Sequence, residues 1–157
     1  MKAFTSEKAA RMHLWRISRH TDLDGIGGLR ASGRWHRAGL RIVYTAQSPA
    51  GALLETCVHT AAGSVPALYT LLRIARSGLP LADISDSELP ANRRTNLDAT
   101  QAIGNRWLTS LSSPLLRVPS ALAPETWNVL INPAHPDAYR LVIEQVYHYP
   151  FDDRLKQ

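Results

Sequence analysis

Residues 33–55 read GRWHRAGLRIVYTAQSPAGALLE, and this stretch predicts a strand that leads directly into a helix. Residues 40–45, LRIVYT, are rich in β-branched and aromatic side chains, which are typical of strands. Ser48 followed by Pro49 predicts a helix start, because serine caps the first turn and proline fits its first position. After that start, apolar residues recur at helical spacing and predict a buried stripe of Ala50, Leu53, Leu54, Cys57 and Val58.

The same stretch places three chemically useful side chains near one another. Arg34 precedes the strand, Tyr44 ends it, and Glu55 lies on the flank of the helix. An arginine, a tyrosine and a carboxylate suit a ligand with a phosphate, an aromatic ring and a sugar, as in a nicotinamide dinucleotide. Spacing alone is equally compatible with a surface arginine, a core tyrosine and a solvated glutamate.

Outward from this stretch, apolar patterns alternate between strand and helix spacing. Helical spacing across residues 96–111 predicts a second helix, with Trp107 as its core anchor. Strands are expected over residues 12–17, 66–75, 81–85, 115–118, 127–131 and 141–149. This order of elements predicts an α+β fold with a mostly antiparallel sheet.

The first of these strands contains an arginine on an apolar face. In residues 12–17, Met12, Leu14 and Arg16 share one side, because side chains alternate along a strand. A partly buried arginine needs an anion or a carboxylate partner. The pattern is compatible with a ligand site and with a structural ion pair.

A glycine-rich segment spans residues 25–39 and includes the run GIGG. This run does not form the G-x-G-x-x-G pattern between a strand and a helix, so a Rossmann site is not predicted. We expect instead a long loop whose glycines let it turn tightly and approach a ligand.

Composition bounds the class of protein. The chain has 157 residues, 45% of them hydrophobic, which fits a single domain. It has no apolar run long enough for a membrane span and no secretory signal, so a cytoplasmic location is expected. One cysteine, Cys57, excludes an internal disulfide, and the six histidines show no metal-ligand spacing.

The net charge of +5 comes mainly from scattered arginines. Such a surface is compatible with plain solvation, with bidentate recognition of phosphate or carboxylate, and with docking of an acidic protein. The alternative interpretation, a non-enzymatic module that binds nucleic acid or a regulatory protein, is therefore also compatible with the sequence. Aromatic residues are not interleaved with basic ones, so direct nucleic-acid binding is not expected.

Three separated motifs together resemble the RES domain: WRIS at residues 15–18, the stretch at residues 33–55, and LLRVPSALAPETWNVLINPAHPDA at residues 115–138. This resemblance implies one RES domain over residues 1–157. It also implies a fold similar to that of ADP-ribosyltransferase toxins, with a split, twisted sheet and flanking helices.

The resemblance further implies the toxin of a bacterial type II toxin–antitoxin pair that depletes NAD. The family cleaves the nicotinamide–ribose bond as a glycohydrolase or phosphorylase, without a metal, and some members transfer ADP-ribose to a host protein instead. Sequence cannot separate these outcomes, because they share the cleavage step. The implied partner is a helix-turn-helix antitoxin of the Xre type that covers the active site, and a homodimer within that complex is compatible with the family.

The family's functional residues fall on Arg16, Arg34, Tyr44, Glu55 and Ser120. Glu55 is expected to act at the ribose, with Tyr44 stacking on nicotinamide. Arg16 and Arg34 are expected to clamp the pyrophosphate, and Arg34 is also expected to be a catalytic residue. Ser120 is expected to hydrogen-bond the ligand.

Two features of these motifs are not explained by the resemblance. Asn128 and Asn132 lie in the motif NVLINP without an assigned role. Ser32 and His36 stand where the family often has a glycine and an asparagine, which places the geometry of the loop around Arg34 in question.

Overall fold

The computed structural model describes residues 2–3 and 12–156 of the chain. Its strands are β1 (Lys2–Ala3), β2 (His13–Ile17), β3 (Val43–Ala46), β4 (Leu68–Ala75), β5 (Leu81–Asp83), β6 (Leu115–Pro119), β7 (Trp127–Ile131) and β8 (Val142–Pro150). Its α-helices are α2 (Gly27–Arg30), α3 (Pro49–His59) and α4 (Leu97–Ser110). Short 3-10 turns are η1 (Ala62–Ser64), η2 (Asp86–Glu88), η3 (Ala138–Arg140) and η4 (Asp153–Lys156).

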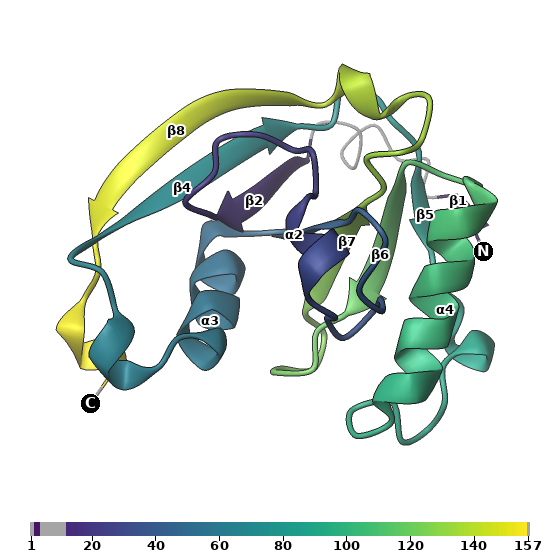
Figure 1. Cartoon of the computed structure of the whole chain (residues 1–157), viewed down its shortest axis with the longest axis horizontal. Helices are drawn as coiled ribbons and strands as arrows, with labels where there is room; N and C mark the ends of the chain where they lie inside the picture. The colour runs from purple at the N-terminus through teal and green to yellow at the C-terminus, as the bar shows by residue number, and fades with distance from the viewer. Residues whose placement is uncertain (1, 4–11, 157) are drawn as a thin grey trace.

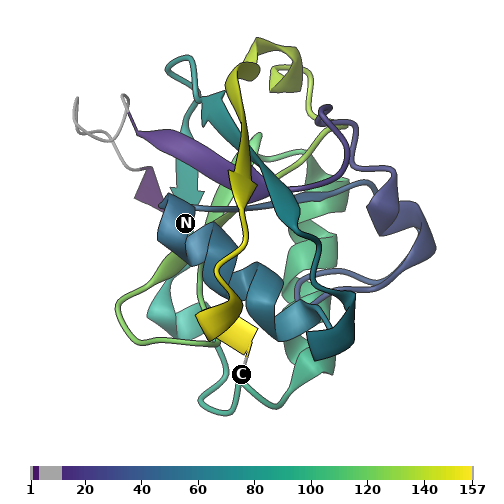
Figure 2. The same cartoon turned by 90° about the vertical axis from the view of Figure 1, so that its left-hand side faces the viewer.

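The strands form one sheet in the order β1-β5-β6-β7-β3-β2-β4-β8. Only β5 and β6 run parallel among these neighbours, so the predicted α+β fold with a mostly antiparallel sheet is confirmed. The long β4–β8 ribbon extends beyond the rest of the sheet on the side of α3 (Figures 1 and 2). No helix among the described residues is long and apolar enough to cross a bilayer.

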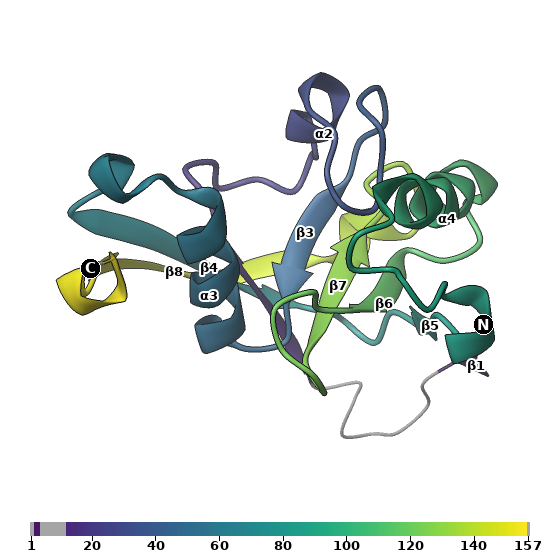
Figure 3. The same ribbon diagram turned by 90° about the horizontal axis from the view of Figure 1, so that it is seen from below.

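Both long helices cover the same face of the sheet and leave β3 between them (Figure 3). Tyr44 packs with the cluster under α4, whereas Ala46, two residues later on the same face, packs against Ala52 of α3. The opposite face carries a separate apolar cluster that includes Leu14, Val43 and Ile131. Residues on this face of β3 and β7 therefore lie between the two helix-covered halves.

Helix α3 begins as predicted but packs differently. The Ser48 hydroxyl accepts a hydrogen bond from the Gly51 amide at 2.9 Å, which confirms the cap. The predicted buried stripe is wrong, because Leu54 and Val58 are 45% and 53% exposed and the buried residue is Ala52. A small alanine lets the helix approach β3 closely, and this choice of face turns the flank with Glu55 toward the sheet.

Helix α4 confirms the second predicted helix. Asn96 caps it by accepting a hydrogen bond from the Ala99 amide at 3.1 Å, and Leu111 ends it in a left-handed conformation. Trp107 is 4% exposed and donates to the Ser113 hydroxyl at 2.9 Å, so its predicted core position is confirmed. Leu97 and Leu111, at the ends of the predicted apolar spacing, are exposed because they lie beyond the sheet contact.

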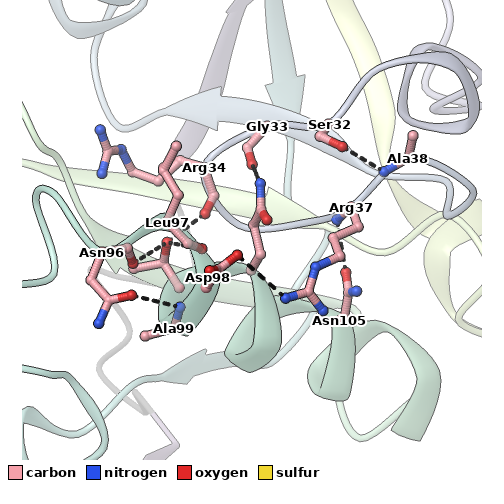
Figure 4. A network of polar contacts seen from close by, with 12 residues as sticks. Ser32, Gly33, Arg34, Arg37, Ala38, Asn96, Leu97, Asp98, Ala99 and Asn105 are labelled. Carbon is pink, nitrogen blue, oxygen red and sulfur yellow. Dashed lines mark hydrogen bonds and ion pairs between the residues drawn. The ribbon is translucent and has the colours of Figure 1, made fainter.

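Helix α4 also holds the loop at residues 33–37 in place (Figure 4). The Thr100 hydroxyl donates to the Arg34 carbonyl at 2.7 Å, and the Gln101 amide donates to the Gly33 carbonyl at 2.9 Å. Gly104 lies directly against the backbone of Trp35, where any Cβ would collide with its carbonyl. The helix therefore fixes the backbone that carries Arg34.

We predict that Gly104→Ala destabilises the fold. Alanine in a helix interior usually stabilises it by about 1 kcal/mol, but overpacking against fixed backbone costs about 1–3 kcal/mol or more. Urea unfolding should show the loss. Gly63→Ala, at a glycine with open space around it, is the matched control and should be near neutral. A more stable Gly104→Ala chain would contradict the close contact.

Candidate active site

Glu55 lies at the centre of a polar cluster made by three separate elements. Its Oε1 accepts hydrogen bonds from the Asn128 amide at 2.8 Å and from the Ser120 hydroxyl at 3.2 Å. The side chain is 29% exposed, and its Oε2 lies 3.9 Å from the exposed His59 ring. Two donors thus fix the carboxylate, while Oε2 faces the more open side.

Ser120 serves as an orienting donor in this cluster. Its hydroxyl donates to Glu55 and accepts from the Leu122 amide at 3.1 Å, and its own amide bonds the Thr126 carbonyl at 2.8 Å. These contacts close the loop between β6 and β7 over the end of the sheet. The structure therefore brings Ser120 and Glu55 together, whereas the expected hydrogen bond from Ser120 to a ligand stays a prediction.

Asn128 and Asn132, left without roles by the sequence, have different ones. Asn128 lies on β7 opposite Ala46 of β3 and points its amide at Glu55. Asn132 is 1% exposed and donates to the Leu108 carbonyl at 3.0 Å, so it ties the end of β7 to α4. Strand alternation could have placed Asn128 on the face of Leu130, but not beside Glu55.

Arg16 is largely buried and incompletely bonded. Its Nη1 donates to the Tyr44 carbonyl at 3.4 Å, and its Nε is buried without a hydrogen-bond partner. Burial lowers the pKa of Arg16, while the charges of Asp22 and Asp24 act in the opposite direction. Within residues 2–3 and 12–156, no carboxylate forms an ion pair with it, so the alternative of a structural ion pair is not found there.

A cavity of about 550 Å³ opens beside this guanidinium. Arg16 and Tyr44 lie on its wall, together with Asp22, Asp24, residues 25–28 and 30–33 from the glycine-rich segment, and His36. The segment contains helix α2, a short helix that the sequence did not predict, and Gly28 packs against the Leu40 carbonyl. Glycines of this segment line the cavity, and their close approach to a ligand stays a prediction.

Tyr44 is held by hydrogen bonds at its hydroxyl. That hydroxyl accepts from the Trp35 amide at 3.1 Å and lies 2.8 Å from His36 Nδ1. Burial raises the pKa of Tyr44 to about 12, although the Trp35 amide and the Arg34 charge act in the opposite direction. At neutral pH the side chain is therefore a neutral phenol, suited to stacking and hydrogen bonding but not to acting as a base.

Arg34 is positioned differently from Arg16. Its Nη1 donates to the carbonyls of Arg94 and Arg93, at 3.0 and 3.4 Å, and its side chain is not on the wall of the cavity. Its charge still influences the Tyr44 hydroxyl, so the two side chains are near neighbours. The structure thus shows Arg34 joining two loops, and its contact with a ligand stays a prediction.

Tyr44 and Asn128 occupy one face of the sheet, whereas Arg16 alternates to the face of Leu14. Tyr44 pairs with Leu130 and Ala46 with Asn128, which makes Tyr44 and Asn128 diagonal neighbours, with Cβ atoms roughly 7–8 Å apart. The Glu55 cluster therefore adjoins the cavity that contains Arg16 and Tyr44. No group of three metal-ligating side chains occurs in the part of the chain that the structure describes.

Known proteins resemble this chain in sequence over most of its length. The RES domain model matches residues 13–152. A Pseudomonas putida protein named "Toxin Res" is 46% identical over 147 residues, covering 92% of this chain and 99% of that protein. A Sphingobium protein named "Prs ADP-ribosylating toxin" is 37% identical, covering 90% of this chain and 94% of that one.

A solved structure extends the likeness to the fold. The toxin–antitoxin complex MbcT–MbcA of M. tuberculosis contains a chain that superposes with a TM-score of 0.69 at 20% identity. The match covers 94% of this chain and 87% of the other. At that identity the likeness concerns the fold.

We predict that Asn128→Asp destabilises the chain in a pH-dependent way. A second carboxylate at hydrogen-bond distance from Glu55 would repel it when both are ionised, at a cost of about 1–3 kcal/mol. The deficit in unfolding free energy should be large at about pH 7.5 and shrink toward about pH 4, where one group becomes protonated.

Urea unfolding at the two pH values measures this effect. Asn128→Ala is the control, because it removes the same hydrogen bond without adding a charge and should show a similar deficit at both. An equal deficit for Asn128→Asp at both pH values would mean that its side chain does not face Glu55.

Proposed function

The chain belongs to the RES domain family and is a toxin of that family, and from this premise we propose that it cleaves the nicotinamide–ribose bond of NAD. The observation that carries the proposal is the buried Arg16 guanidinium, which lines the cavity with an unpartnered Nε. Asp22 and Asp24 on the cavity wall attract Arg16 but form no ion pair with it. A largely buried cation without an ion-pair partner is costly, and an anionic ligand relieves that cost. The pyrophosphate of a dinucleotide supplies such an anion.

The Glu55 cluster suits the reacting end of the same ligand. When the glycosidic bond breaks, its electron pair leaves with nicotinamide and positive charge develops on the ribose. A carboxylate fixed by Ser120 and Asn128 stabilises that charge without having to reorient. Tyr44, a neutral phenol beside the cavity, offers an aromatic face to nicotinamide.

The acceptor of the ribosyl group defines the activity. Water gives ADP-ribose, inorganic phosphate gives its phosphorylated counterpart, and a protein side chain gives an ADP-ribosylated protein. The similarity to a protein named as an ADP-ribosylating toxin favours protein modification as the second candidate. All three require the same cleavage, so the site chemistry above is common to them.

An antitoxin partner forms part of the proposal. A chain that consumes NAD freely would exhaust its host, and the fold is shared with a protein solved in a toxin–antitoxin complex. We expect a helix-turn-helix protein of the Xre type to cover the cavity and present an acidic group or a terminal carboxylate to Arg16.

We predict that expression of this gene alone arrests growth of the host cells, and that co-expression of the adjacent gene restores growth. The control is Glu55→Gln expressed alone, which should be tolerated if toxicity comes from the site. Tolerated expression of a catalytically active wild-type chain would contradict the toxin–antitoxin arrangement and leave NAD breakdown as a housekeeping activity.

We predict that Glu55→Gln lowers NAD turnover by about a hundredfold or more. The amide can still accept hydrogen bonds from Ser120 and Asn128, so the fold should persist, but the negative charge at the ribose is lost. Nicotinamide release, measured by chromatography with and without phosphate and cell extract, gives the rate. Near wild-type turnover would remove Glu55 from the chemistry.

We predict that Arg16→Gln weakens NAD binding without lowering the stability of the fold. Losing the cation should raise the Michaelis constant for NAD by roughly ten- to a hundredfold, because charged hydrogen bonds contribute about 1.5–3 kcal/mol. Unfolding free energy should stay constant or rise, because a buried unpaired charge disappears. Arg19→Gln, at an exposed neighbouring arginine, is the control and should change neither. A lower stability with an unchanged Michaelis constant would make Arg16 structural.

A further inference from the structure

His36 is almost fully buried, at 3% exposure, on the wall of the cavity. Its Nδ1 lies 2.8 Å from the Tyr44 hydroxyl, and its Nε2 lies 3.2 Å from the Gly28 carbonyl. The Trp35 amide donates to the same hydroxyl at 3.1 Å. These contacts join the glycine-rich segment, the turn at residues 33–36 and strand β3 at one side chain.

The partners of His36 define where its proton lies. A carbonyl can only accept, so Nε2 must carry a hydrogen and donate it to Gly28. In the neutral ring Nδ1 is then an acceptor, so the Tyr44 hydroxyl donates to it. Burial lowers the pKa of His36, although hydrogen bonding to the backbone of Gly28 and Ala31 acts in the opposite direction, and burial favours the neutral form.

The groups that His36 joins have little room to move. Gly28 packs against the Leu40 carbonyl and the Ile42 backbone, and Gly33 packs against the Tyr44 hydroxyl. Both glycines line the cavity. The phenol is therefore enclosed by Gly33, the Trp35 amide and His36, and the last of these supplies its acceptor.

We propose that His36 is a positioning residue of the NAD site, which acts by fixing the Tyr44 phenol through Nδ1 and the glycine-rich wall through Nε2. The inference rests on the proposed function in one respect, namely that Tyr44 contacts the dinucleotide. A ring held in place before the ligand arrives loses less freedom on binding, so its support strengthens affinity.

Two amide variants separate the two contacts. In His36→Asn, Oδ1 is at the same bond path from Cβ as Nδ1 and can accept from Tyr44. In His36→Gln, Nε2 is at the same bond path as the ring Nε2 and can donate to Gly28, but the acceptor for Tyr44 is lost. Each variant therefore keeps a different one of the two polar contacts: His36→Asn keeps the contact with Tyr44, and His36→Gln keeps the contact with Gly28.

Steady-state kinetics with NAD and thermal unfolding of both variants test the role. We expect His36→Gln to raise the Michaelis constant about three- to tenfold, the size of one neutral hydrogen bond, and His36→Asn to remain near wild type. Both should lose similar stability. Equal Michaelis constants for the two variants, at any stability, would overturn the proposal.

A second measurement is independent of NAD turnover. Nitrogen NMR of the histidine ring should show an unprotonated Nδ1 and a protonated Nε2 for His36, and Tyr44→Phe should shift the Nδ1 resonance. The opposite tautomer, or no response to Tyr44→Phe, would overturn the proposal. A wild-type chain that leaves NAD intact while showing the expected tautomer would instead refute the proposed function and the role in NAD binding, leaving only the local geometry.

Discussion

Arg16 lies on β2, next to the Trp15–Ala46 pair that joins β2 to β3. Among the described residues, its guanidinium donates a hydrogen bond only to the Tyr44 carbonyl, and its Nε has no partner. A cation buried in this way costs several kcal/mol unless an anion joins it. The cavity beside it provides access for that anion. Asp22 and Asp24 line the same cavity and attract this charge without forming an ion pair with it. An anion that entered the cavity would meet a guanidinium whose Nε has no hydrogen-bond partner in the described part of the chain, as the proposed binding of a pyrophosphate requires.

The two helices complete the site by covering separate halves of one face. Helix α3 approaches β3 through Ala52 and turns Glu55 toward Ser120 and Asn128. Helix α4 approaches through Gly104 and holds the turn that carries Arg34. Tyr44 lies on β3 and packs with the apolar cluster under α4, and its hydroxyl accepts a hydrogen bond from the Trp35 amide. Tyr44 and the Glu55 cluster therefore lie in adjacent parts of one face of the sheet.

Sequence patterns predicted both long helices and seven of the described strands, all except β1, because caps and apolar periodicity are local signals. The buried face of α3 was predicted wrongly, since periodicity favours Leu54 and Val58, whereas close packing selects Ala52. Strand alternation identified Arg16 as an arginine on an apolar face. Only the structure showed that no carboxylate among the described residues forms an ion pair with it. The contact of Asn128 with Glu55 joins residues 73 positions apart and has no local signal.

A crystal structure of the Glu55→Gln chain with NAD tests the central claim most directly, because slow turnover should preserve the ligand. The account predicts the pyrophosphate against the Arg16 guanidinium, nicotinamide beside the Tyr44 ring, and the adjoining ribose at residue 55. NAD bound elsewhere, or with its pyrophosphate away from Arg16, would contradict the account.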